Sequence, residues 1–134
     1  MNSENLFDLC SFFLKRYGFG NETLVSLIQK WKVFVEECED GYRWDYSEYL
    51  NEIRCRTLLQ RLLDEPRIAG ADEFKELFDE QACLDEMFKC LLQPDMFLGE
   101  SDNWWEKRVL IRAGEEYCFY MEKAHGISVE CVDC

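Results

Sequence analysis

The stretch NETLVSLIQKWKVFVEECEDG, residues 21–41, carries the clearest helical pattern in the chain. Asn21 is a suitable N-cap, and Asp40-Gly41 interrupts the pattern at the other end. Between them, apolar residues recur at spacings of three and four, which places them on one face of an α-helix. They are Leu24, Leu27, Ile28, Trp31, Val35 and Cys38. We therefore predict a helix here that is buried along one side.

Similar patterns on both sides predict further helices. Each begins at a residue that can cap an N-terminus and ends at a glycine or a proline. The caps are Ser3, Asp45 and Asp72, and the breaking residues are Gly18, Pro66 and Pro94. The expected helices span residues 3–17, 45–65 and 72–93, with a loop at 67–71.

The part of the chain after residue 104 allows two interpretations. Seven apolar matches between Trp105 and Ala124 predict a fifth helix, at a cost of about 1 kcal/mol for the internal Gly114. Alternatively, residues 108–112 and 116–121 form a hairpin, and residues 127–132 add a third strand. We favour the helix. The predicted fold is an all-α, compact bundle of about five helices forming one domain over residues 1–134; the alternative is an α+β fold with a small C-terminal antiparallel sheet over residues 108–132.

The composition predicts a folded, cytoplasmic protein. Hydrophobic residues make up 48% of the chain and aromatics 15%, enough to form a core despite the net charge of −13. No basic segment precedes an apolar run at the start, and no run approaches the ~18 residues that a membrane span needs. We expect the eight cysteines to be reduced. Cys131 and Cys134 have CxxC spacing, but with one histidine, His125, they lack partners for a zinc site. We expect no metal or cofactor.

The acidic residues are concentrated in one region. Between Asp64 and Asp102, twelve acids accompany only three basic residues. A surface of this charge repels nucleic acid and favours a basic protein partner, with aromatic side chains as anchors. The expected partner-binding residues are Asp72, Glu76, Asp79, Glu80 and Glu86 on the fourth helix, and Asp95, Phe97, Glu100, Asp102 and Trp104 after it. The other interpretation is an acidic face that only maintains solubility.

The sequence contains no recognisable catalytic apparatus. It has one histidine and no glycine-rich phosphate loop, HExxH motif or nucleophile elbow. Pairs of carboxylates are frequent, but a chain with 28 acids produces them by chance. We therefore expect a binding protein rather than an enzyme.

In size, charge and helix content, though in no specific motif, the chain is similar to bacterial immunity proteins. These proteins neutralise a cognate toxin, very often a basic nuclease. The resemblance implies an inhibitor that binds a basic toxin domain. Two alternatives stay open: a homo-oligomeric structural or regulatory domain that associates through Met96, Phe97, Trp104 and Trp105, and an acidic nucleic-acid mimic that blocks a DNA-binding protein. The oligomeric state is not predicted.

Overall fold

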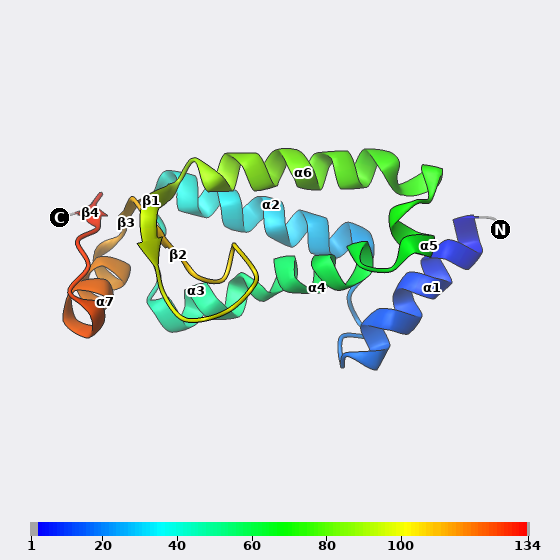
Figure 1. Ribbon diagram of the computed structural model, residues 1–134, viewed down its shortest axis with the longest axis horizontal. Coiled ribbons are helices and arrows are strands. Elements are labelled where there is room, and N and C mark those ends of the chain that lie inside the picture. Colours follow the sequence, from blue (N-terminus) through cyan, green and yellow to red (C-terminus); the bar gives the residue numbers. More distant parts are fainter. Residues whose placement is uncertain (1–2, 134) are drawn as a thin grey trace.

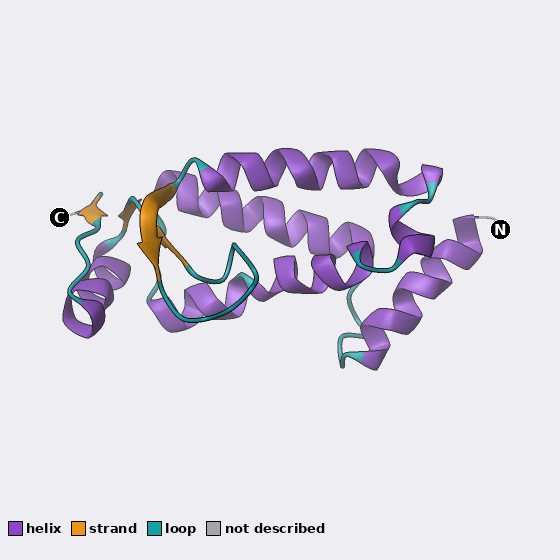
Figure 2. Ribbon diagram, in the orientation of Figure 1, coloured by secondary structure: helices purple, strands orange, loops and turns teal. Residues whose placement is uncertain are grey.

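The helix predicted most clearly from sequence, α2 (Leu24–Gly41), packs between α6 (Lys75–Lys89) and α4 (Arg54–Leu63) (Figure 1). The computed structural model describes residues 3–133. Helix α1 (Ser3–Arg16) packs against α4 at one end of the molecule. The side chain of Ser3, its predicted cap, lies outside the described part of the chain. The fold is a mostly helical single compact domain, in which strands occupy a small part (Figure 2).

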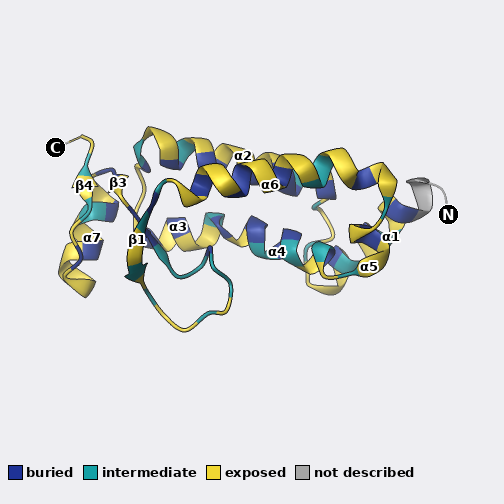
Figure 3. Cartoon of the chain, turned by 45° about the horizontal axis from the view of Figure 1, so that its top comes forward, coloured by how far each residue is buried: buried dark blue, intermediate teal, exposed yellow. Residues whose placement is uncertain are grey.

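The core lies along the inner side of α2. The side chains that the sequence pattern assigned to its buried face are buried, and Phe34 joins them. Phe34 contacts Phe88 of α6, and Trp31 meets the same ring edge to face at a centroid distance of 5.0 Å. Figure 3 shows buried positions on the facing sides of these helices and exposed positions outside. Aromatic packing of this kind adds about 0.5–1.5 kcal/mol per pair to area burial.

The predicted cap of α2 is wrong by two residues. Thr23 is the N-cap: its Oγ1 accepts from the Ser26 N–H at 3.0 Å, and the Thr23 N–H donates to Ser26 Oγ at 2.8 Å. Asn21 is excluded because the turn that follows α1 extends past it, with the Glu22 N–H donating to the Phe19 carbonyl. A capping box therefore starts the central helix.

The predicted helix over residues 45–65 is divided. Asp45 caps its start as expected, accepting from the Glu48 N–H at 2.9 Å. The chain then forms α3 (Tyr46–Glu52) and α4, joined at Ile53. Pro66 begins a short helix, α5 (Pro66–Ala69), because a proline fits the first helical position, where no N–H is needed. The expected loop at 67–71 is thus helical over its first three residues.

The fourth helix is shorter than predicted. It opens with a 3₁₀ turn, η1 (Asp72–Phe74), continues as α6, and ends at Lys89. Strand β1 (Leu92–Phe97) follows and pairs antiparallel with β2 (Arg108–Leu110), with an irregular register between the two ends. Leu92 and Gln93, which were expected to end the helix, therefore belong to a strand. Leu92 is paired with Leu110 of β2.

The predicted fifth helix is confined to α7 (Glu115–His125). Before it, β2 and β3 (Arg112–Ala113) are extended, and β3 pairs parallel with β4 (Glu130–Cys131). The Gly114 N–H donates to the Tyr42 carbonyl at 2.7 Å, so the backbone here bonds to a distant segment and cannot continue a helix. The alternative prediction correctly placed strands within 108–132. Its hairpin is wrong, since residues 116–121 are helical.

Tyrosine side chains attach α7 to the rest of the domain. Tyr117 packs edge to face on Tyr49 at 5.2 Å, and Tyr120 stacks on Tyr46 at 4.9 Å. The Tyr117 hydroxyl also accepts from the Leu110 N–H at 3.1 Å. The C-terminal elements thereby share a core with α2 and α3. Within residues 3–133, no helix has the length and apolar character needed to cross a bilayer.

Candidate partner-binding surface

The acids predicted on the fourth helix are exposed. We define the acidic surface as the exposed carboxylates of η1 and α6, which adds Glu73 to the predicted set. Its members are Asp72, Glu73, Glu76, Asp79, Glu80 and Glu86. Within the described chain, Glu86 alone of the six has an ion pair, with Lys89 Nζ at 3.2 Å. The other five carboxylates therefore present uncompensated charge to solvent.

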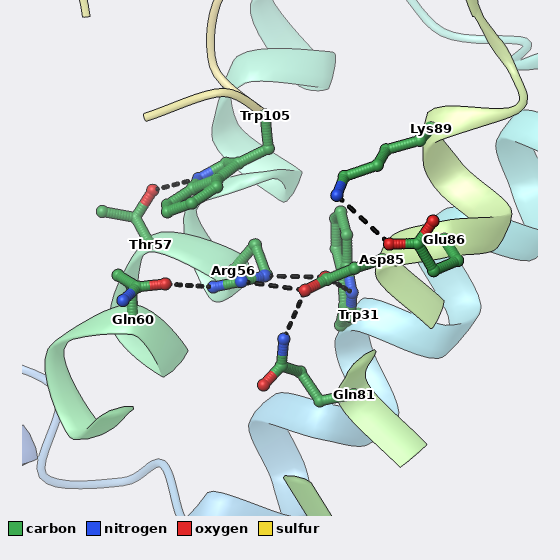
Figure 4. Close-up of polar contacts among 9 residues, drawn as sticks. All are labelled: Trp31, Arg56, Thr57, Gln60, Gln81, Asp85, Glu86, Lys89 and Trp105. Carbon is green, nitrogen blue, oxygen red and sulfur yellow. Dashed lines mark hydrogen bonds and ion pairs between the residues drawn. The ribbon is translucent and has the colours of Figure 1, made fainter. Parts of the chain in front are cut away.

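Asp85 lies on the same helix but points inward, where its two oxygens receive hydrogen bonds from three side chains (Figure 4). Arg56 of α4 binds it in a bidentate manner, with Nε at 2.8 Å from Oδ1 and Nη2 at 2.9 Å from Oδ2. Trp31 of α2 donates its indole N–H to Oδ1 at 3.0 Å, and Gln81 donates to Oδ2. This buried network connects three helices and fixes the face that α6 presents outward.

The network extends to the segment after β1 through Arg56. The guanidinium carbon lies 4.3 Å from the ring centroid of Trp105, and Arg56 Nη1 donates to Gln60 Oε1 at 3.1 Å. Trp105 donates its indole N–H to Thr57 Oγ1 at 2.9 Å (Figure 4). Sequence reasoning missed this arrangement. The available signal was a pair of polar residues, Gln81 and Asp85, within the apolar stripe of the fourth helix.

The predicted binding residues after α6 lie on β1 and on the loop that leads to β2. Asp95, Glu100 and Asp102 are exposed, as predicted. The chain after β1 returns to the C-terminal end of α6, where the Trp104 ring lies 6.2 Å from that of Phe88. Sequence spacing could not reveal this path of the chain, because the strand that redirects it was not predicted.

The two predicted aromatic anchors have cationic neighbours. The exposed ring of Phe97 lies 5.0 Å from the Arg108 guanidinium carbon and 5.8 Å from Lys107 Nζ. Trp104 is half-buried, and Lys89 Nζ lies 4.8 Å from its ring centroid. Cations over aromatic faces are mutually stabilising. Both rings are therefore engaged within the chain, and Phe97 is in a locally basic environment rather than an acidic one.

The cysteines differ partly from expectation. Cys131 is disulfide-bonded, so the prediction that the thiols are all reduced is wrong at this position; Cys134 lies outside the described residues. Burial raises the pKa of the Cys10 thiol to about 11 and that of Cys55 to about 12, which keeps both protonated at neutral pH. Across residues 3–133, no group of three or more His, Cys, Asp or Glu side chains is arranged to hold a metal ion.

The acidic surface is thus a row of exposed carboxylates on η1 and α6, held in orientation by the buried ion pair between Arg56 and Asp85. No protein-family model, curated protein or solved structure matches the chain.

Proposed function

We propose that this chain is a non-enzymatic binding protein whose acidic surface binds a basic protein partner. The supporting observation is the set of six exposed carboxylates on η1 and α6, of which only one has an ion pair within the described chain. Like charges at three- and four-residue spacing on a helix destabilise it by roughly 0.2–0.5 kcal/mol per pair. Lysine and arginine side chains of a partner would neutralise these carboxylates. The repulsion relieved in this way would favour association.

The partner that fits best is a nuclease-type toxin, which makes the protein a bacterial immunity protein acting in the cytoplasm. A nuclease needs a cationic cleft to hold the phosphate backbone of its substrate. A rigid row of carboxylates competes for that cleft, and it also accelerates association through long-range attraction. The buried network around Asp85 supports this role because it holds α6 before binding, which lowers the entropy cost of ordering the surface.

The experiment is an affinity capture from a lysate of the native organism, followed by kinetics with the purified partner. A basic protein is expected, with an association rate that falls as salt rises. Neutralising Glu76, Asp79 and Glu80 together (to Gln, Asn and Gln) should slow association by about tenfold, in the range reported for steered encounters. It should also flatten the salt dependence.

The matched control neutralises three exposed acids near the C-terminal end of α2, namely Glu36, Glu39 and Asp40. This variant has the same net charge and should retain most of the association rate. Equal losses in the two variants would show that only total charge matters and would overturn the placement on α6. Capture of no basic protein, with the bait eluting as an oligomer, would instead favour the self-association alternative.

A further inference from the structure

The disulfide at Cys131 lies in β4, which packs beside α7 at one end of the molecule (Figure 1). Within residues 3–133, the other six cysteines are free: Cys10, Cys38, Cys55, Cys83, Cys90 and Cys118. The chain has eight cysteines, and the remaining one is Cys134. By elimination, Cys134 is the cysteine available to pair with Cys131. The two have CxxC spacing, which is typical of pairs that exchange between disulfide and dithiol.

The backbone around Cys131 is held by contacts that do not involve sulfur. Strand β4 pairs with β3, and the Val132 N–H donates to the Ala113 carbonyl at 3.0 Å. Val132 also lies directly against the end of α2, since a Cβ placed on Gly41 would be 2.4 Å from its Cγ2. Opening the disulfide therefore leaves this segment in place. A segment that is already ordered loses little chain entropy when the bond closes again. The fold is thus compatible with both redox states.

The surroundings of Cys131 admit a reductant and favour the reduced form. Cys131 is half-buried and lines a surface pocket of about 490 Å³ between α7 and the segment that leads to β4. The Oδ1 atom of Asp133 lies 3.2 Å from the Cys131 sulfur. A sulfur in a disulfide has no hydrogen to donate, so this contact becomes a hydrogen bond only when Cys131 is a thiol. Asp133 therefore stabilises the thiol and not the disulfide.

Cys118 lines the same pocket but is not suited to exchange with the disulfide. Its Sγ donates to the Ala113 carbonyl at 3.5 Å and to the Glu130 carbonyl at 3.6 Å. Burial raises the pKa of the Cys118 thiol, and the charge of Asp133 raises it further. Because the thiolate is the attacking species, a thiol that stays protonated at neutral pH is a poor nucleophile. Cys118 is therefore a neighbour of the site and a control for it.

We propose that Cys131 and Cys134 form a reversible redox site that exchanges with thiol reductants. A thiolate of the reductant attacks one sulfur of the disulfide and displaces the other, which takes up a proton. A second thiol of the reductant then breaks this mixed disulfide, releases the second protein thiol and leaves the reductant as a disulfide. Two electrons and two protons pass to the protein. In a reducing compartment, such disulfides are usually transient and redox-sensing. The site does not depend on the function proposed for the acidic surface.

The test follows the redox state of the full chain in glutathione buffers that range from mostly oxidised to mostly reduced. After acid quenching, free thiols are alkylated with N-ethylmaleimide, and mass spectrometry measures the tryptic peptide 124–134, which contains Cys131, Cys134 and no other cysteine. The disulfide should form in the most oxidising buffer, open as the buffer becomes reducing, and form again on return. Structural disulfides resist glutathione. A peptide that stays oxidised in the most reducing buffer, or reduced in the most oxidising one, would overturn the proposal.

Cysteine variants identify the second sulfur. In Cys134→Ser, the peptide should show no internal disulfide in any buffer, and Cys131 should carry either the alkyl label or one glutathione. Cys118→Ser is the matched control in the same pocket, and Cys83→Ser is the control for an exposed thiol elsewhere. Both should leave the ratio of disulfide to dithiol within about twofold of the parent at every buffer composition. Loss of the disulfide in Cys118→Ser, or a peptide in which Cys131 is joined to Cys118, would overturn the assignment.

Substitutions of Asp133 test the contribution of the neighbouring carboxylate. Asp133→Ala removes the acceptor of the Cys131 thiol and should shift the equilibrium toward the disulfide by about two- to fivefold, as expected for one hydrogen bond at a partly exposed position. Asp133→Asn keeps an acceptor oxygen without the charge and should give a smaller shift. Circular dichroism of each variant checks that the fold is retained. An equilibrium that is unchanged in a folded Asp133→Ala variant would overturn the role assigned to this side chain.

Discussion

Asp85 shows how one side chain determines which face of a helix is available. Of the seven acids between Asp72 and Lys89, it is the one that is buried. A buried carboxylate costs several kcal/mol unless charge and hydrogen bonds compensate it. Four donor groups on Arg56, Trp31 and Gln81 supply that compensation. A rotation of α6 would break these bonds, so the outward direction of its other acids is fixed.

We predict that Asp85→Ala lowers the free energy of unfolding by about 3–5 kcal/mol, because it leaves the Arg56 guanidinium buried without a counter-charge. Urea denaturation followed by circular dichroism measures the change. Glu86→Ala is the matched control: its ion pair with Lys89 is solvent-exposed, and the change should stay within about 0.5 kcal/mol. A loss below about 1 kcal/mol for Asp85→Ala would show that the network contributes little to stability.

At the scale of single elements, the helices with strong local signals were predictable. The apolar periodicity located α1 and α2, and the same pattern placed four acids of α6 on its exposed side: Glu76, Asp79, Glu80 and Glu86. The break at Ile53 was not predictable, because the apolar spacing continues through it. The favoured prediction missed the short strands for a different reason: β2 has three residues and β3 has two, too few to establish an alternating pattern.

Helix caps provide a direct comparison between the sequence prediction and the structure. Thr23→Ala removes a side-chain acceptor for the first turn of α2 and should cost about 1 kcal/mol of unfolding free energy. Asn21→Ala, at the cap predicted from sequence, should change it by less than about 0.5 kcal/mol, as at an ordinary surface position. Thermal and urea unfolding of both variants would measure the difference. A larger loss for Asn21→Ala would place the start of α2 where the sequence pattern put it.

At the scale of the whole molecule, distant segments meet where the C-terminal part closes on α2. Tyr42 forms a bridge with Ala113, and β4 pairs with β3 on the other side. The same long-range organisation sets the positions of Asp95, in β1, and of Asp102, in the loop before β2. Only the helical part of the candidate site was therefore predictable from sequence, since the positions of the remaining residues depend on contacts between segments far apart in the chain.

A substitution at Gly41 tests how much the packing of the C-terminal segment against the end of α2 contributes to stability. Its φ is +101°, and an added Cβ would lie 2.4 Å from Val132 Cγ2. Gly41→Ala should therefore destabilise the domain by about 2 kcal/mol or more, from backbone strain and from displacement of the C-terminal segment. Gly99 also has a positive φ, +77°, but no atom within 4 Å of the added Cβ. Gly99→Ala should cost only about 1–2 kcal/mol, as measured by urea denaturation. Equal losses would show that the contact with Val132 contributes nothing.

The pairing of β3 with β4 has a consequence for biosynthesis. The helical contacts of α1 to α6 join segments that leave the ribosome early, and they can form while translation continues. The Val132 N–H, which donates to the Ala113 carbonyl at 3.0 Å, emerges far later. During that interval the nascent chain exposes the tyrosines that α7 later covers.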